Sequence, residues 1–295
     1  MLGKILVFGS TLALAVSAAL ASSTAQPVAN LSAGEIVNKN IAARGGLEAW
    51  RALQTVSMEG KLGAGGNQRA PIPVPVASKG EGGLHIPVRP KDEAQLPFVM
   101  RMERPRKLRL EIQFNGQTAV QVYDGTHGWK VRPFLNRNEV ENYTPEELEA
   151  AALAPDLDGP LVDYAAKGTT VELEGTEKVE DRDTYKLKVT AKNGHVTHVW
   201  IDAQTFLEAK MDGQPRKLDG KEHQVEIYYR DYRPVNGLQF PFVLETRVLP
   251  FNPKSKFREN PVPPEKIVID KIEVNPQFSA SLFMRPSVQS ASSQH

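Results

Sequence analysis

The fold is decided by residues 107–123, which read KLRLEIQFNGQTAVQVY. Apolar and polar residues alternate from Leu108 to Phe114, as expected of a strand with one buried face and one wet face. The Asn115-Gly116 pair that follows is a strong hairpin signal, because both residues tolerate a positive φ. Residues 107–123 therefore predict two antiparallel strands joined by a tight turn.

The same alternation continues outward along the chain, at residues 98–102, 187–189, 225–229 and 238–244. Further turns are predicted at four pairs: Asp124-Gly125, Asn193-Gly194, Asp212-Gly213 and Asn236-Gly237. We expect nine or ten strands, consecutive and mostly joined by hairpins, which gives an antiparallel meander.

Helical patterns occur in two regions that flank the first group of strands. Two of the predicted helices begin with the spacing of a capping box, Ser32 with Glu35 and Thr144 with Glu147. The expected helices are residues 33–44, 47–53 and 145–154, with a further short helix at 159–166. Trp50 is expected to be a core anchor. A large one-sided sheet needs cover for its apolar face, and these helices are the candidates to supply it.

The two ends of the chain and two internal stretches lack the sequence pattern of β-strands. Residues 1–21 combine Lys4, a short apolar run and the pattern Ala19-Leu20-Ala21, which predicts a cleaved signal peptide. Proline and glycine concentrate in two stretches, so we expect long surface loops there. The predicted organisation is a flexible N-terminus at 22–31, one domain at 32–285 with loops at 63–97 and 250–264, and a disordered tail at 286–295.

Composition excludes several function classes. The formal net charge of +1 gives no field to attract nucleic acid or an anionic membrane surface. With no cysteine, the chain has no disulfide, cysteine-ligated zinc, thiol nucleophile or lipidated N-terminal cysteine. An exported chain without cysteine suits a bacterial periplasm.

Signatures of catalysis and of cofactor binding are thin. His195 and His198 lie three apart in a predicted strand, so their rings point to opposite faces and do not form a metal pair. The glycines at 63–66 lack the lysine and helix of a phosphate loop, and no Gly-x-Ser-x-Gly sequence occurs. We expect no catalytic residues, no metal, no cofactor and no enzymatic activity.

The remaining chemical feature is the apolar face of the first strands, whose methionines suit flexible apolar partners. For each residue alone, an ordinary core position is the simpler interpretation. For the face as a whole, we expect that two short helical regions do not completely cover nine or ten strands. The candidate ligand-binding residues are Met100, Met102, Leu108, Leu110, Ile112, Phe114, Val120 and Val122.

Several segments resemble the bacterial outer-membrane lipoprotein-sorting proteins of the LolA/LolB-like family. They are ARGGLEAW at 43–50 followed by TVSMEG at 55–60, YDGTHGW at 123–129, the hairpin at 185–202 and YRPVNGLQFP at 232–241. The resemblance covers residues 32–62 and 98–285. It implies a mainly β (α+β) fold: an unclosed antiparallel β-barrel, that is, a strongly curved sheet, with helices covering an apolar cavity. The insertion at 63–97 departs from the family pattern, and no lid residue is transferred.

From the resemblance we expect a periplasmic carrier or binding protein for acylated lipoproteins or lipid, monomeric, with a transfer partner at the inner or outer membrane. The alternative is an envelope sensor that shares the fold, with a filled core and a protein partner, because fold alone does not settle function. Copurifying acyl chains would favour the carrier, and a stoichiometric protein partner without lipid would favour the sensor.

Overall fold

The computed structural model describes residues 30–65, 93–154, 156–218, 220–250 and 263–287. The predicted signal peptide, most of the loops at 63–97 and 250–264, most of the flexible N-terminus and most of the C-terminal tail lie outside these ranges.

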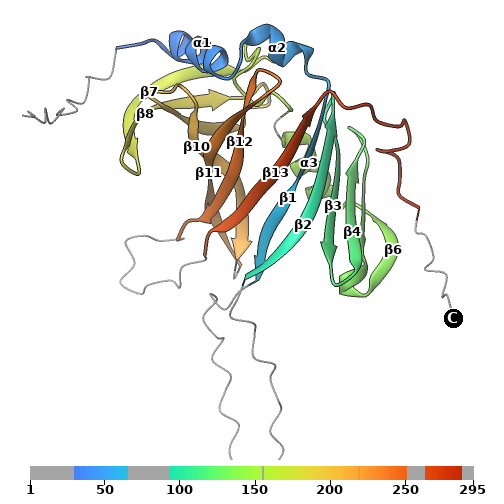
Figure 1. Ribbon diagram of the computed structural model, residues 1–295. Helices are drawn as coiled ribbons and strands as arrows, with labels where there is room; N and C mark the ends of the chain where they lie inside the picture. Colours follow the sequence, from blue (N-terminus) through green and yellow to red (C-terminus); the bar gives the residue numbers. More distant parts are fainter. Residues whose placement is uncertain (1–29, 66–92, 155, 219, 251–262, 288–295) are drawn as a thin grey trace, which may run out of the picture.

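The described chain forms one antiparallel sheet of 13 strands that does not close into a barrel. Figure 1 shows the sheet curving around α3, with α1 and α2 across one end. The strands before α3 are β1 (Thr55–Gly65), β2 (Glu93–Glu103), β3 (Lys107–Phe114), β4 (Gln117–Tyr123), β5 (Gly128–Arg132) and β6 (Arg137–Asn142). Those after it are β7 (Thr170–Val179), β8 (Arg182–Thr190), β9 (Val196–Asp202), β10 (Glu208–Leu218), β11 (Lys221–Val235), β12 (Leu238–Val248) and β13 (Glu265–Val274). The predicted fold class, a mainly β, curved and unclosed antiparallel sheet, is confirmed.

The strand order is β6-β5-β4-β3-β2-β1-β13-β12-β11-β10-β9-β8-β7. Two meanders of six strands each are thus joined at the centre of the sheet by β13, which pairs with β1 on one side and β12 on the other. The chain passes from the edge strand β6 to the opposite edge strand β7 through α3 (Pro145–Leu153) and the residues that follow it. We call the described residues of 145–169, α3 included, the crossing segment.

The loop expected at 63–97 was too long, because β1 continues to Gly65 and β2 begins at Glu93. The prediction of nine or ten strands was too low. β6 reads RNEVEN, and as an edge strand its exposed polar residues carry no alternation from which it could be recognised. The turn predicted at Asp212-Gly213 was wrong, because both residues lie inside β10. Gly213 is needed there for a different reason: a Cβ at this position would lie 2.8 Å from Val225 Cγ1 on the neighbouring strand.

The predicted hairpin at residues 107–123 is confirmed. Asn115 and Gly116 have φ values of 49° and 74°, and Phe114 pairs with Gln117 across the turn. The turn at Asn236-Gly237 also has positive φ at both residues, 47° and 83°.

The two N-terminal helices, α1 (Ala33–Ala43) and α2 (Leu47–Ala52), pack on the end of the sheet. The capping box predicted at Ser32 and Glu35 is present. α1 buries Ile36, Val37 and Ile41 in the main core. Trp50 of α2 is 1% exposed and packs on Phe240 with ring centroids 5.4 Å apart, which confirms it as a core anchor.

The third helix, α3, also begins as predicted, with Thr144 and Glu147 forming a capping box and Pro145 at its first turn. No residue of α3 is fully buried. Residues 157–168 form a series of turns in place of the short helix expected at 159–166, and Leu161 and Val162 anchor them in the main core.

Candidate functional site

Five of the eight candidate ligand-binding residues share the concave face of the sheet. Antiparallel partners point to the same side, and Met100 pairs with Leu110 while Met102 pairs with Leu108. Ile112 continues this row, and all five are half-buried. Phe114 follows them at the end of β3, where it is 37% exposed.

The expectation that Val120 and Val122 belong to the same face was wrong. Val120 pairs with Glu111 and Val122 with Arg109, so both point to the convex face. The cause is the two-residue turn at Asn115-Gly116, which pairs Phe114 with Gln117 and thereby places even-numbered residues of β4 beside odd-numbered residues of β3. The sequence was sufficient to predict the face of Val120 and Val122, because the Asn115-Gly116 turn sets the register between the two strands.

Val122 is nevertheless fully buried, at 0% exposure. The C-terminal segment after β13 lies on this side of β3: Arg109 Nη1 donates to the carbonyl oxygen of Leu282 at 3.2 Å, and the buried Phe283 ring lies 5.8 Å from Lys107 Nζ. The convex face of the first meander is therefore partly covered by the chain end.

Three cavities lined by described residues lie between the crossing segment and the concave face. The first, of about 240 Å³, lies between Met100, Met102 and Leu108 of the sheet and Ala151 and Ala154 of the segment. The second, also about 240 Å³, extends beside Met102, Leu157 and Met211 toward β11 and β12. The third and largest, about 400 Å³, lies on the β8 and β9 side.

The cavities adjoin one another, since Asp156 lines all three and Met102, Pro160 and Met211 each line more than one. The largest has the volume of an ordinary small-molecule site, ~300–1,000 Å³. Four of the chain's six methionines, Met58, Met100, Met102 and Met211, line the cavities. Methionine is unbranched and polarizable, so it can adapt to a flexible apolar ligand.

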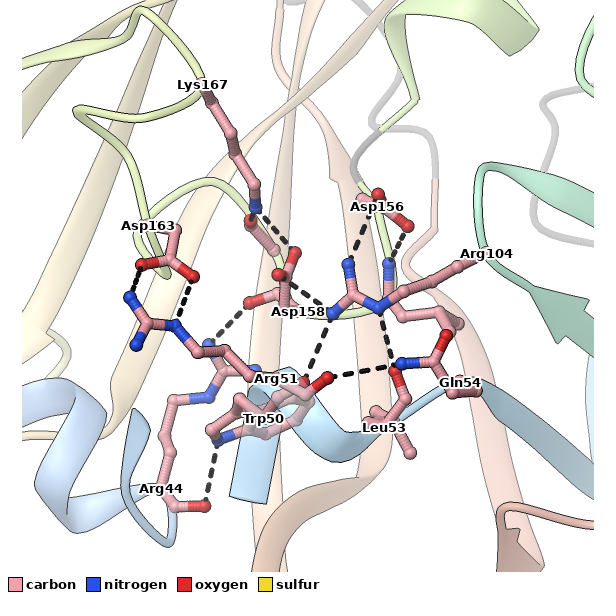
Figure 2. A network of polar contacts seen from close by, with 12 residues as sticks. Arg44, Trp50, Arg51, Leu53, Gln54, Arg104, Asp156, Asp158, Asp163 and Lys167 are labelled. Carbon is pink, nitrogen blue, oxygen red and sulfur yellow. Dashed lines mark hydrogen bonds and ion pairs between the residues drawn. The ribbon is translucent and has the colours of Figure 1, made fainter. Parts of the chain in front are cut away.

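The crossing segment is held in place by polar side chains from α2, β2 and the turn between α1 and α2 (Figure 2). Arg104, just after β2, donates to Asp158 Oδ2 at 2.9 Å and to the carbonyl oxygens of Leu53 and Trp50 at 2.7 and 3.2 Å. It also lies 3.5 Å from Asp156 Oδ2. Arg104 therefore ties the sheet, α2 and the crossing segment together at one point.

Asp158 is the acceptor at the centre of this network, with its side chain 4% exposed. Besides Arg104 it accepts from Lys167 Nζ at 2.6 Å, within the crossing segment itself (Figure 2). Its backbone carbonyl accepts from Arg44 Nη1 at 3.0 Å. A buried carboxylate requires such partners, because an unpaired charge in the interior is costly.

At the surface the same segment is fastened to α2 by a bidentate ion pair. Arg51 Nε and Nη2 donate to Asp163 Oδ2 and Oδ1 at 2.9 and 2.7 Å. This hydrogen bonding lowers the pKa of Asp163 below its ordinary value.

One end of the second cavity is polar. Arg44 stacks on Trp50, 4.1 Å from the ring centroid, and pairs with Glu208 at 3.2 Å. Tyr232 donates to Glu208 at 3.0 Å. Burial raises the pKa of Tyr232 well above its usual value, and the nearby Glu208 carboxylate raises it further. The tyrosine therefore acts as a neutral hydrogen-bond donor.

Sequence reasoning missed the polar residues that hold the crossing segment: Arg44, Arg51, Arg104, Asp156, Asp158, Asp163 and Lys167. These residues come from segments that are far apart in the sequence, so no local spacing marks them. The only local sign is the Asp156-Leu157-Asp158-Gly159 run after the end of a helix, which resembles an ordinary turn.

Among the described residues, no three His, Asp or Glu side chains are placed to hold a metal ion. His195 lies in the turn before β9, whereas His198 lies within β9, 2.7 Å from Asp212 Oδ2. No helix in the described part of the chain has the length and apolar character needed to cross a membrane.

Comparison with solved structures finds the same fold. A LolA superfamily protein from Nitrosomonas europaea has a TM-score of 0.50 and 10% identity, over 86% of this chain and 97% of that one. A DUF1329 family protein from Desulfovibrio piger also has a TM-score of 0.50, with 12% identity over 88% and 99% of the two chains. No protein-family model and no curated protein matches the sequence. The resemblance inferred from the sequence is thus confirmed at the level of the LolA-like fold.

Proposed function

We propose that this protein is a periplasmic carrier or binding protein for acylated lipoproteins or lipid, which holds acyl chains between the crossing segment and the concave face. The observation that carries the proposal is the set of adjoining methionine-lined cavities beneath a segment that is held by side-chain contacts and not by strand pairing. The role is binding and transfer, without catalysis, in the manner of a chaperone for an apolar cargo.

The energetics suit reversible binding. Each buried methylene contributes ~0.8 kcal/mol, so an acyl chain of moderate length supplies the main driving force. Each of the adjoining cavities is small, so an acyl chain can enter fully only when the crossing segment moves and widens the space between them. Breaking the contacts of Asp158 offsets part of the gain, which leaves an affinity low enough for release.

Export supports the same role. Residues 1–21 have the pattern of a cleaved signal peptide, and delivery of a lipid-modified cargo across an aqueous compartment needs a carrier that shields its acyl chains from water. Such a carrier would exchange cargo with a transfer partner at the inner or outer membrane.

A second candidate is a non-transport envelope protein that binds a protein partner. It is favoured by the size of the main core, which includes residues of α1, the crossing segment and both meanders, among them Ile36, Val56, Leu161, Leu187 and Phe240. In that case the cavities are packing defects without a ligand, and the protein partner binds to the outer surface.

Two measurements separate the candidates. Organic extraction and mass spectrometry of the purified protein should find acyl chains if it is a carrier. Met102→Trp should then fill the two smaller cavities and weaken binding of a fluorescent fatty-acyl probe, whereas Met284→Trp should not, because Met284 is 61% exposed and lines none of the three cavities. A folded wild-type protein that binds no acyl probe and carries no lipid would refute the carrier function.

A further inference from the structure

The largest cavity differs from the other two in having a basic mouth. Three cationic side chains from three separate elements line it: Arg106 in the turn between β2 and β3, Lys167 in the crossing segment, and Lys192 in the turn between β8 and β9. The imidazole of His195 lines it as well. The buried part of the lining is apolar and includes Val189 and Met211, which are 3% and 9% exposed.

The charges at this mouth do not cancel locally. Asp156 also lines the cavity, but its Oδ2 lies 3.5 Å from Arg104 and its Oδ1 accepts from the backbone N–H of Leu157. Lys167 and Arg104 share the second carboxylate, Asp158. These two carboxylates match Arg104 and Lys167, which leaves Arg106 and Lys192 in excess. In a chain whose total formal charge is only +1, this local surplus stands out.

The position of Lys192 at the mouth is fixed by packing and by the turn that carries it. Its aliphatic stem lies over Gly168, where an added Cβ would be 3.3 Å from Lys192 Cβ and Cδ. The turn that carries it is fixed by Gly194 N–H donating to Ala191 O and Ala191 N–H donating to His195 O, both at 2.8 Å. Within the ranges that the structure describes, no carboxylate pairs with Lys192 and the His195 ring makes no hydrogen bond.

Arg106 is placed to act with it. Its Nη1 donates to the carbonyl oxygen of Ala152, which orients the guanidinium along the end of α3, and no carboxylate of the described residues pairs with it. A guanidinium and an ammonium that line the same cavity can both donate to a carboxylate or phosphate, and such charge-assisted hydrogen bonds are strong.

We propose that this cavity binds the anionic headgroup of a lipid, a carboxylate or a phosphate, between Arg106, Lys167 and Lys192, with the acyl chain running past Met211 toward the second cavity. The inference rests on the proposed carrier function and names its ligand class. Met211, Gly159 and Pro160 line both cavities, so the second cavity lies directly beside the one with the basic mouth.

The test compares one acyl chain with and without its charge, using cis-parinaric acid and its methyl ester as fluorescent probes on the full-length mature protein. Wild-type protein should bind the acid about tenfold more tightly than the ester, and added salt should reduce the difference. Lys192→Gln, and more strongly Arg106→Gln with Lys192→Gln, should remove most of this preference while leaving ester binding unchanged. Lys178→Gln is the matched control, since Lys178 is exposed and lies at the opposite end of β7 from the cavity.

Two further arms identify the source of the anion. Lysophosphatidic acid should displace the acid probe, and inorganic phosphate at the same concentration should not. Equal displacement by phosphate would overturn the lipid assignment in favour of a small anion. Equal affinity of wild type for acid and ester would overturn the headgroup site while leaving the carrier function intact, whereas failure to bind either probe would overturn both.

Discussion

Arg104 and Asp158 form the contact on which the geometry of the site depends. Their Nη2 and Oδ2 atoms lie 2.9 Å apart, and the Asp158 side chain is 4% exposed. One residue follows β2 and the other lies in the crossing segment, so their pairing fixes how far that segment stands from the sheet. The cavities on either side are therefore set by a polar contact and not by apolar packing alone.

We predict that Arg104→Gln loosens the crossing segment. The change removes the charge that faces Asp158, and leaves Lys167 as its remaining cationic partner, so unfolding free energy should fall by about 2 kcal/mol. Hydrogen exchange should accelerate at residues 156–168 before it does so in the sheet. Arg101→Gln is the control, because Arg101 pairs with Glu111 on the convex face in a half-exposed pair worth ~0–1 kcal/mol. Equal exchange in both variants would contradict a fastening role.

The register of β3 and β4 gives a second prediction. Leu110→Lys places a charge on the concave face, and Val120→Lys places the same charge on the convex face beside Glu111. We expect the first to cost about 2–4 kcal/mol, or to leave a folded protein that no longer binds an acyl probe. The second should cost less than about 1 kcal/mol. Denaturant midpoints and probe binding measure both, and a larger loss for Val120→Lys would mean that the faces are reversed.

Acid should weaken the contact of Glu180 with two arginines on the convex face. Arg230 and Arg247 lower the pKa of Glu180 to about 2, chiefly through the hydrogen bonds from Arg230. Since the folded-state pKa is depressed, this contribution is complete above the ordinary pKa of 4.5 and is lost as the pH falls toward 2. The stability difference between wild type and Glu180→Gln should therefore shrink between about pH 4.5 and 2.

That difference should be modest even at pH 7, because Glu180 is partly exposed and solvent screens the pair. Glu149→Gln on α3 provides a control for the loss of a carboxylate. A pH-independent difference for Glu180→Gln would show that the arginines do not stabilise the ionised form.

The two capping boxes offer a matched pair of changes. Ser32→Ala and Thr144→Ala remove equivalent bonds, each worth about 1 kcal/mol. α1 is anchored by three buried apolar side chains, so Ser32→Ala should raise hydrogen exchange only in the first turn of this helix. α3 buries no residue fully, so Thr144→Ala should raise hydrogen exchange along the whole helix. Equal exchange in both helices would indicate that α3 has packing support beyond its cap.

The sequence predicted those features that depend on neighbouring residues. The capping boxes and the Asn115-Gly116 turn are local, and each is present. The alternation at 108–114 predicted β3 correctly as a strand, but not its exposure: residues 107–112 are half-buried on both faces. The polar network is not local: Arg104 and Asp158 are 54 residues apart, and Arg51 and Asp163 are 112 apart. Exposed edge strands such as β6 escape detection because they have no buried face. Val120 and Val122 were assigned to the wrong face because their apolar character was considered without the register between β3 and β4.

The position of β13 has a consequence for how the protein is made. Without it, the described strands form two six-stranded meanders with no strand pairing between them, and the central pairing joins residues about 200 positions apart in sequence. Such distant contacts are slow to form, because a long loop must close first. The central pairing must wait until β13 has been synthesised, so the two meanders stay unpaired until late in synthesis. Under the proposed export, this delay would keep the chain from completing its fold before it crosses the membrane.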